Sequence, residues 1–452
     1  MSTKRKSYEI GCKSQDILKH MRQIRNFEEL AISELRRDAL SIAEAGYEAI
    51  NTDKVVMGKM QFGNGELRIS DKTYKIDRRK VFYVGVGKCA ISAGRTIEKI
   101  LGDALTAGVA LDVTISEQAN KKPETSKLEI IIGTHPLPSE ANVAGSKRIL
   151  RFLADKNEDD LVIFVVSGGG SVLLCLPEAS MTPADESELF KELTKKGAPI
   201  QDLNIVRKHI SRARGGALAV SAYPAEIVSL IFSDVPGNDI HTVSSGPTIL
   251  DSSTVRDAQT VLTKYGIEGA GVEFIETPKE QKYFARVTNL LFMSNQDALS
   301  AMSDEAARRG YTATIADDRF TGEAREVGRA IAEKLHSSEP KTALLYSGES
   351  TVKIDTGVGV GGRNQELSLS ALEYLNEGEL ILPFASDGRD NTNHAGAIAD
   401  EITHAHAREK NLSIEEHLHA HNSYDFFKSS GDALITGYTG SNVSDLVIAL
   451  KK

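Results

Sequence analysis

The chain has 452 residues, of which 40% are hydrophobic, and a formal net charge of −9. This composition excludes a disordered chain, and the acidic balance excludes a basic surface able to follow a nucleic acid. The three cysteines form no C-x-x-C pair, which excludes a zinc site of that kind and a disulfide framework. Charges throughout the first thirty residues and the lack of a long apolar run predict a cytoplasmic protein without a membrane span.

Strands and helices alternate along the first part of the chain. Helical spacing of apolar residues at 31–50 predicts a surface helix, and the run 80–84 predicts a buried strand that leads through a glycine turn into a helix. Further strands are expected at 109–115, 160–167 and 227–233. Continuous Val, Ile and Leu in these strands predict a parallel sheet covered by helices on both faces, which is a Rossmann-like α/β/α domain.

A chain of this length usually forms two domains. Periodicity fades between about residues 266 and 288, and a second α/β pattern follows. Its strands are expected at 290–293, 313–315, 342–346 and 380–385. We therefore predict a first domain at residues 1–285, which includes the N-terminal helical segment, and a second at 286–452. Because ligands bind at the carboxyl ends of parallel strands, we expect the active site in the cleft between the two domains.

The first glycine turn, Gly85-Val86-Gly87-Lys88, directly follows a predicted strand. Glycines in such a turn let the backbone approach an anion, and Lys88 adds a positive charge at the start of the next helix. A carboxylate or phosphate suits this charge better than a nicotinamide does, so Lys88 is a candidate for catalysis and for substrate binding. The alternative is a tight turn whose lysine points into solvent.

Three successive glycines follow another buried strand. Such a run costs conformational entropy, and its exposed amides can form a nest for an anion. Gly168, Gly169, Gly170 and Ser171 are therefore candidates for binding nucleotide phosphates, and Ser167 is a candidate for binding the substrate. A tight crossover between strand and helix is the alternative.

Five basic side chains lie within eight residues, shortly after Asn204. They are Arg207, Lys208, His209, Arg212 and Arg214. Arginine binds carboxylates and phosphates through two parallel hydrogen bonds, so Asn204 and Arg207 are candidates for holding the substrate. Because such runs usually form a solvated helix face, we expect only one or two of the five to reach a site.

Two aspartates follow predicted strands. Asp234, at the end of the strand 227–233, could accept the proton of a substrate hydroxyl or bind Mg²⁺. Asp387, after the strand 380–385, is a second candidate metal ligand. The alternative for Asp234 is a structural cap, since Asp-x-Pro-Gly is a common turn sequence.

A second glycine-rich loop ends in Gly361-Gly362-Arg363-Asn364 and enters a helix. Arg363 would stand beside free amides at the helix start, as a phosphate clamp does, and Gly361, Gly362 and Asn364 are candidates for binding the nucleotide. A flexible loop with a solvated arginine is the alternative. Basic residues at glycine-rich strand ends in both domains predict a cleft that closes on two anions, as phosphoryl transfer requires.

In this order, the motifs together resemble the glycerate 2-kinase family, whose members carry a C-terminal MOFRL domain. The resemblance runs from about Val81 to the C-terminus. It rests on the segments 84–88, 135–138, 167–171, 204–216, 233–237, 245–248, 361–366, 387–388, 395–397 and 439–445.

The resemblance implies a C-terminal α/β MOFRL domain and ATP-dependent phosphorylation of D-glycerate at its 2-hydroxyl, which yields 2-phosphoglycerate and ADP and feeds central carbon metabolism. It also implies ATP and Mg²⁺ as cofactors, and catalytic roles for Lys88, Asp234 and Arg363. Where the family usually has Asp, Asp, Gly, Gly and Pro, this sequence has Ser139, Asn238, Ser347, Asn391 and Tyr438.

Other functions stay open at this point. They are a kinase for a related small hydroxy acid, a sugar-phosphate isomerase or binding protein, a ligand sensor and, least favoured, a nicotinamide dehydrogenase. The expected partners are a small substrate and a nucleotide, with neither nucleic acid nor membrane. The sequence is also compatible with a homodimer.

Overall fold

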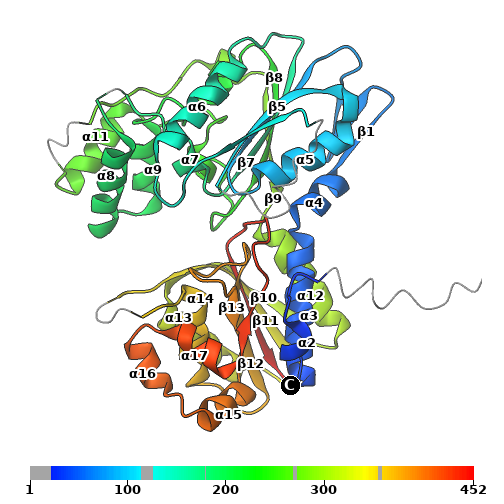
Figure 1. Cartoon of the computed structure of the whole chain (residues 1–452), viewed down its shortest axis with the longest axis vertical. Coiled ribbons are helices and arrows are strands. Elements are labelled where there is room, and N and C mark those ends of the chain that lie inside the picture. Colours follow the sequence, from blue (N-terminus) through cyan, green and yellow to red (C-terminus); the bar gives the residue numbers. More distant parts are fainter. Residues whose placement is uncertain (1–21, 114–125, 179, 268–271, 355–358) are drawn as a thin grey trace, which may run out of the picture.

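The computed structural model describes residues 22–113, 126–178, 180–267, 272–354 and 359–452. Two α/β lobes are stacked along the long axis of the molecule, each built around its own sheet (Figure 1). The two-domain α/β fold predicted from the sequence is therefore confirmed. No helix among these residues is long and apolar enough to cross a membrane.

The first lobe contains a six-stranded sheet in which every neighbouring pair is parallel. Its strands, in spatial order, are β6 (Leu128–Ile132), β5 (Leu105–Asp112), β4 (Val81–Val86), β7 (Leu161–Ser167), β8 (Glu226–Phe232) and β9 (Val287–Met293). In chain order this is the 3-2-1-4-5-6 arrangement of a Rossmann fold. The order reverses between β4 and β7, and ligands of such sheets bind at that point.

Helices cover both faces of this sheet. The helices of this lobe are α5 (Ala90–Leu101), α6 (Glu140–Leu153), α7 (Gly170–Leu173), α8 (Pro183–Lys195), α9 (Ile200–Lys208), α10 (Ala217–Ala222) and α11 (Val255–Lys264), with 3₁₀ turns at Gly102–Ala104, Val243–Ser245 and Gln281–Tyr283. Of these, α8, α9 and α11 pack with one another in a separate hydrophobic cluster beside the sheet. Alternate residues of β4 enter opposite cores: Tyr83 packs with α5 on one face, and Val84 packs with α6 and α10 on the other. Burial on both faces explains why the strand is apolar throughout.

The second lobe contains a mixed sheet. Its strands are β10 (Thr312–Glu323), β11 (Thr342–Thr351), β16 (Asp445–Lys451), β12 (Glu379–Ala385), β13 (Gly396–Ala397) and β15 (Ala433–Leu434), and β14 (Ala399–Asp400) pairs with β12. Its helices are α12 (Asn295–Arg308), α13 (Ala324–His336), α14 (Arg363–Leu372), α15 (Glu401–Glu409), α16 (Ile414–His419) and α17 (Ser423–Ser430). The C-terminal strand β16 lies between β11 and β12 and is antiparallel to both.

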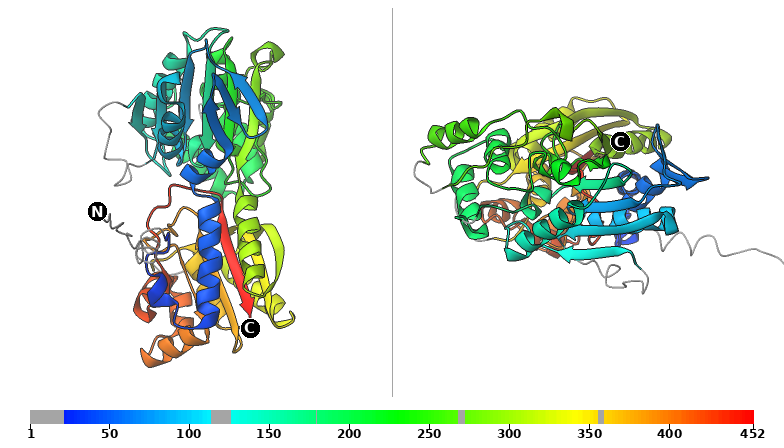
Figure 2. Two further views of the ribbon diagram at one scale, coloured as in Figure 1. Left: turned by 90° about the vertical axis from the view of Figure 1, so that its right-hand side faces the viewer. Right: turned by 90° about the horizontal axis from the view of Figure 1, so that it is seen from above.

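The N-terminal segment lies against both lobes. It forms α2 (Phe27–Leu30), α3 (Glu34–Ala49) and α4 (Thr52–Lys59), followed by a small antiparallel sheet of β1 (Met60–Gly63), β2 (Glu66–Ile69) and β3 (Lys72–Lys75). Helix α3 packs against α12, β12 and β16, and Figure 2 shows it running beside β16. It therefore belongs to the second lobe, although the sequence placed it in the first domain.

The division between the domains also differs from the predicted one. Strand β9 completes the first sheet, so the chain leaves that sheet at Met293 rather than at residue 285. Amphipathic spacing shows that one face of a segment is buried, but not against which sheet, because that depends on distant parts of the chain.

A buried ion cluster fixes α3 to the second lobe. Arg36 is 1% exposed, and its guanidinium lies 2.6 Å from Asp400 and 2.8 Å from Asp432, both of which are also buried. Thr403 accepts a further hydrogen bond from Arg36, at 2.9 Å. Because all partners are out of water, loss of the arginine would leave two buried carboxylates without their counter-ion.

We expect Arg36→Ala to lower the free energy of unfolding by about 3–5 kcal/mol, since breaking a buried ion pair leaves its charged partner buried without a counter-ion. Urea unfolding followed by circular dichroism measures the loss. The matched control is Arg37→Ala on the same helix, whose side chain is 49% exposed and whose replacement should cost less than about 1 kcal/mol. Equal losses in the two variants would contradict the structural role of the Arg36 cluster.

Candidate active site

The turns after β4 and β7 meet at the point where the strand order reverses. The Lys88 amide donates to the Gly168 carbonyl at 3.0 Å, which ties the two turns together. Gly87 has φ +113°, and a Cβ there would lie 2.3 Å from the Ser167 carbonyl oxygen, so only glycine fits. This packing fixes Lys88 at the carboxyl edge of the first sheet.

The Lys88 ammonium reaches across to the second lobe. Its Nζ lies 2.9 Å from Oδ2 of Asp387, which follows β12. Burial disfavours the charge, but the carboxylates of Asp387 and Asp234 outweigh it and raise the pKa of Lys88 above its ordinary value. Lys88 is therefore a fixed positive charge between the lobes, as the sequence predicted.

Asp234 follows β8 and lies beside the same turns. Its Oδ2 accepts a hydrogen bond from Asn442 Nδ2 at 2.9 Å. A Cβ on Gly168 would lie 1.9 Å from this oxygen, so Gly168 provides room for the carboxylate. Burial raises the pKa of Asp234 to about 6, against the opposing effect of the Lys88 charge.

The loop between β15 and β16 reaches from the second lobe to these strand ends, as the red segment between the lobes in Figure 1 shows. Tyr438 donates its hydroxyl hydrogen to the Lys88 carbonyl at 2.9 Å. Ser444 donates to the Asp234 carbonyl at 2.8 Å, and Asn442 binds the Asp234 side chain. The sequence analysis recorded residues 439–445 as a motif but assigned no role to them, because their partners lie hundreds of residues away.

Arg363 begins α14 in the second lobe. Its Nε lies 2.5 Å from Oδ2 of Asp445, and its Nη1 pairs with Glu349. These carboxylates raise the pKa of Arg363 above its ordinary value despite the burial of the guanidinium. Asp445 directly follows Ser444, and Glu349 also acts on Asp234 electrostatically. Lys88 thus acts directly on Asp234, and Arg363 is linked to Asp234 through Glu349 and the Ser444-Asp445 segment.

Gly361 and Gly362, which directly precede Arg363, pack against protein groups. Asp390 accepts from the amides of Asn364 at 3.1 Å and Gln365 at 2.8 Å, so its carboxylate caps α14. Cβ atoms on Gly361 and Gly362 would lie 2.2 Å from Ser423 Oγ and 2.1 Å from the Asp390 carbonyl oxygen. The geometry therefore does not support a phosphate nest at Gly361, Gly362 and Asn364, because a protein carboxylate already occupies the helix amides.

Ser167 and Asn204 are also engaged within the protein. Ser167 is fully buried, and its hydroxyl accepts from the Cys89 amide at 3.1 Å and donates to the Val86 carbonyl at 3.3 Å. Asn204 Oδ1 accepts from Ser245 at 3.2 Å, and Ser245 also contacts Ser171 at 3.0 Å. These side chains position the turn after β7. The Ser167 hydroxyl is fully engaged, whereas the Asn204 Nδ2 group has no partner among the described residues, so Asn204 stays a candidate.

Most of the basic segment stabilises the first lobe. Arg214 is buried and lies 2.6 Å from Glu186, Lys208 lies 3.0 Å from Asp251, and Arg212 forms a surface pair with Glu178. The ring of His209 is buried and contacts Ile275 O and Ser253.

Arg207 differs from the other four. Its guanidinium carbon lies 4.6 Å from the centroid of the Phe190 ring, and the described residues give it no carboxylate partner. It is the member of this segment whose charge stays available to a ligand.

The comparisons with known proteins agree with this arrangement. Residues 38–275 match a domain family described only as DUF4147, and residues 342–445 match the MOFRL family. A glycerate 2-kinase of Pyrococcus horikoshii is 35% identical over 439 residues, which cover 92% of this chain and 97% of that protein. The crystal structure of a glycerate kinase from Thermotoga maritima superimposes with a TM-score of 0.78 at 32% identity, over 92% of this chain and 99% of that one.

The chain belongs to the glycerate 2-kinase family. One relative has a different name: a protein of Agrobacterium vitis provisionally named a hydroxypyruvate reductase is 33% identical over 386 residues, or 82% of this chain and 86% of that protein.

Three of the departures from the family pattern are engaged at this site. Asn238 donates to Asn295 at 2.8 Å, and Asn295 donates to Ser347, which in turn donates to the Asp445 carbonyl at 3.1 Å. Tyr438 contacts Lys88, as noted above. In this member of the glycerate 2-kinase family, Asn238 and Tyr438 therefore form hydrogen bonds between the lobes, and Ser347 forms its hydrogen bonds within the second lobe.

Among the residues that the structure describes, no group of three or more His, Cys, Asp or Glu side chains is arranged to hold a metal ion. Asp387 pairs with Lys88, and Asp234 accepts from Asn442. The two aspartates predicted as metal ligands do lie at one edge of the cleft, as their mutual electrostatic effect indicates.

We expect Asp234→Asn to stabilise the protein. The pKa of this carboxyl rises from 3.8 to about 6 on folding, so its ionisation opposes folding; the penalty builds between about pH 4 and pH 6 and is complete at higher pH. The gain in unfolding free energy should be about 2 kcal/mol at pH 8 and largely absent near pH 4, by urea titration. Asp304→Asn on the exposed side of α12 is the control. A pH-independent effect of Asp234→Asn would contradict the assignment.

Proposed function

We propose that this protein transfers the γ-phosphoryl group of ATP to the 2-hydroxyl of D-glycerate, giving 2-phosphoglycerate and ADP. The observation that carries the proposal is the Lys88 ammonium, which pairs with Asp387 of the second lobe and acts on the buried carboxylate of Asp234. Arg363 is linked to the same site because Glu349 acts on both Arg363 and Asp234. The name of the Pyrococcus horikoshii relative supports the same reaction. The catalytic roles of the three residues, predicted from the sequence, are part of this proposal.

Asp234 is suited to accept the proton of the substrate hydroxyl. With a pKa of about 6 it is ionised at neutral pH, yet it is more basic than an ordinary aspartate. In the proposed step the hydroxyl oxygen bonds to the γ-phosphorus, its proton passes to Asp234, and the bond from phosphorus to the leaving oxygen of ADP breaks. The carboxylate thus makes the hydroxyl a better nucleophile as the new bond forms.

Lys88 and Arg363 are suited to neutralise the negative charge of the transferred group. Both are buried enough to interact strongly with an anion, and both already have fixed positions because carboxylates hold them. To bind phosphate oxygens they must exchange these carboxylates for the ligand. Positioning and charge stabilisation supply most of the catalysis in phosphoryl transfer, so this exchange is a central step.

Asp234 and Asp387 fit the proposed Mg²⁺ ion. Magnesium is usually bound by one or two carboxylates together with substrate phosphates and water, so a closed set of protein ligands is not required. When bound, the ion would neutralise charge on the nucleotide phosphates. The carboxylate of Asp387 becomes available once Lys88 turns to a phosphate oxygen.

Other expectations from the sequence stay predictions. They include a cytoplasmic location, the compatibility with a homodimer and the absence of nucleic-acid or membrane partners. A sugar-phosphate isomerase or binding protein would need no nucleotide, and a kinase of a related hydroxy acid would share the site. The assay below separates these alternatives.

The decisive experiment supplies D-glycerate, ATP and Mg²⁺, couples ADP release through pyruvate kinase and phosphoenolpyruvate to lactate dehydrogenase, and identifies the product by phosphorus NMR. We expect 2-phosphoglycerate. 3-Phosphoglycerate, or turnover of sugar phosphates without ATP, would contradict the proposal. NADH oxidation in a separate assay with hydroxypyruvate would instead support the name of the Agrobacterium vitis relative.

We expect Arg363→Ala to lower kcat at least about a hundredfold, because it removes the charge that faces the transferred group. Arg363→Lys keeps the charge but loses the two-pronged pairing with Asp445, so an intermediate loss is expected. Arg329→Ala, on the surface of α13, is the control and should keep its activity. Thermal melts show whether each variant is folded, and near-normal turnover of folded Arg363→Ala would remove the residue from the mechanism.

A further inference from the structure

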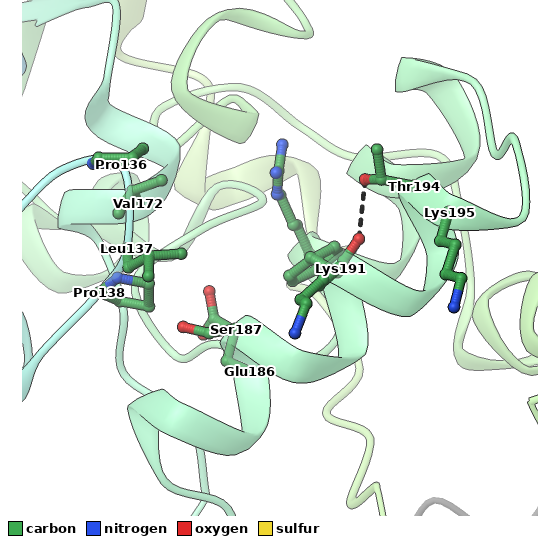
Figure 3. Close-up of a pocket in the computed structure, with 11 residues that line it drawn as sticks. Pro136, Leu137, Pro138, Val172, Glu186, Ser187, Lys191, Thr194 and Lys195 are labelled. Carbon is green, nitrogen blue, oxygen red and sulfur yellow. Dashed lines mark hydrogen bonds between the residues drawn. The ribbon is translucent and has the colours of Figure 1, made fainter. Parts of the chain in front are cut away.

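A cavity of about 430 Å³ lies in the first lobe, outside the cleft contacts described so far. One wall is the segment Pro136-Leu137-Pro138 with Val172 of α7, and the opposite wall is α8, as Figure 3 shows. Phe190 and Arg207 also line it. Its size falls within the range of small-molecule sites, and its walls are mostly apolar, as such sites usually are.

The charges around the cavity favour an anionic ligand. Lys191 and Lys195 line the α8 side. Glu186 also lines it, but its carboxylate is neutralised by the buried Arg214. Arg207 has no carboxylate partner among the described residues, and burial together with the nearby Arg214 charge lowers the pKa of Arg207 to about 10. It remains protonated at neutral pH, and an anion would compensate its charge.

Two chain segments connect this cavity to Lys88. The first is the turn that begins at His135. Gly169 lies between this turn and Lys88, because a Cβ built on Gly169 would lie 3.4 Å from the His135 ring and 3.5 Å from Lys88 Cγ. The second is the turn after β7, in which Gly169 and Val172 are separated by only two residues. The cavity and the Lys88 turn therefore share a wall, and a ligand in the cavity can extend to the cleft along Ser171.

The second lobe has fewer free groups that could bind a nucleotide. Asp390 occupies the amides at the start of α14, and Arg363 is held between two carboxylates. An apolar cavity with unpaired positive charge is found instead in the first lobe. A flat base needs apolar walls, whereas a phosphate chain needs cations, which Arg207 in the cavity wall and Lys88 at the turn after β4 supply.

We propose that this cavity receives the purine base and ribose of the nucleotide donor, whose phosphate chain runs past Ser171 to Lys88. The assignment rests on the proposed kinase function and adds the location of the donor. Arg207 then binds the nucleotide rather than the carboxylate of the substrate, which changes the role that the sequence assigned to it. D-glycerate then binds on the side of Lys88 and Asp234 that faces the cleft.

The test uses isothermal titration calorimetry of the full chain with ATP and, separately, with inorganic tripolyphosphate, both without D-glycerate. Val172→Trp fills the cavity and should raise the Kd for ATP at least about tenfold while the Kd for tripolyphosphate stays within about twofold. Leu137→Asp, on an exposed turn residue, adds a negative charge to the same wall and should weaken ATP binding to a similar degree. The Leu137→Asp variant also keeps the test valid if the Val172→Trp variant does not fold.

Steady-state kinetics then separate donor from acceptor. Arg207→Met should raise KM for ATP about tenfold, since it removes a charged partner of the ligand, and leave KM for D-glycerate within about twofold. Arg212→Met, in the same basic segment but on the surface, is the matched control and should change neither constant.

Three outcomes would overturn the assignment: unchanged ATP affinity in folded cavity variants, equal loss of tripolyphosphate and ATP binding, or a rise in KM for D-glycerate alone in Arg207→Met. Failure of the proposed function gives a different result. A wild-type chain that binds ATP in a manner sensitive to Val172→Trp, yet does not phosphorylate D-glycerate, would refute that function and leave the cavity as the nucleotide site.

Discussion

The ion pair between Lys88 and Asp387 is the contact on which the site depends. It joins the carboxyl edge of the first sheet to the strand end of β12 in the second lobe, at 2.9 Å. Around it, Asn442 and Ser444 bind Asp234, and Tyr438 binds the Lys88 backbone. The two lobes therefore meet through polar groups at their strand ends. Such an interface can exchange protein carboxylates for ligand oxygens without exposing an apolar core.

The junction between the lobes holds more carboxylates than cationic side chains. Lys88 pairs with Asp387 and acts on Asp234, whereas Arg363 pairs with Glu349 and Asp445. Burial is the main reason why the pKa of Asp234 is high, and the carboxylates of Glu349 and Asp387 add to it. The excess of negative charge also suits a nucleotide that arrives with a divalent cation, because the cation can satisfy the carboxylates that Lys88 and Arg363 release. A polyphosphate without a bound cation would be repelled by these carboxylates.

The glycines show that one kind of motif can admit either a ligand or a neighbouring residue. The sequence predicted an anion nest at Gly168, Gly169 and Gly170, and nucleotide binding at Gly361 and Gly362. In the structure Gly168 is required because Asp234 packs against it, and Gly362 because Asp390 does. The absence of a side chain permits close approach in every case, but the approaching group is a protein carboxylate here. Composition alone does not distinguish a ligand from a neighbouring residue at such a position.

Local pattern determined four strands of the parallel sheet (β4, β5, β7 and β8) and the placement of Lys88 and Asp234 at strand ends, because apolar runs and the turns after them are properties of adjacent residues. Strand β6 was not predicted from the sequence. The tertiary structure alone decided that α3 belongs to the second lobe, that β9 completes the first sheet, and that Asp390 caps α14. It also singled out Arg207, whose four basic neighbours in the sequence are engaged within the protein. These facts depend on contacts between residues far apart in the chain, for which short-range spacing carries no information.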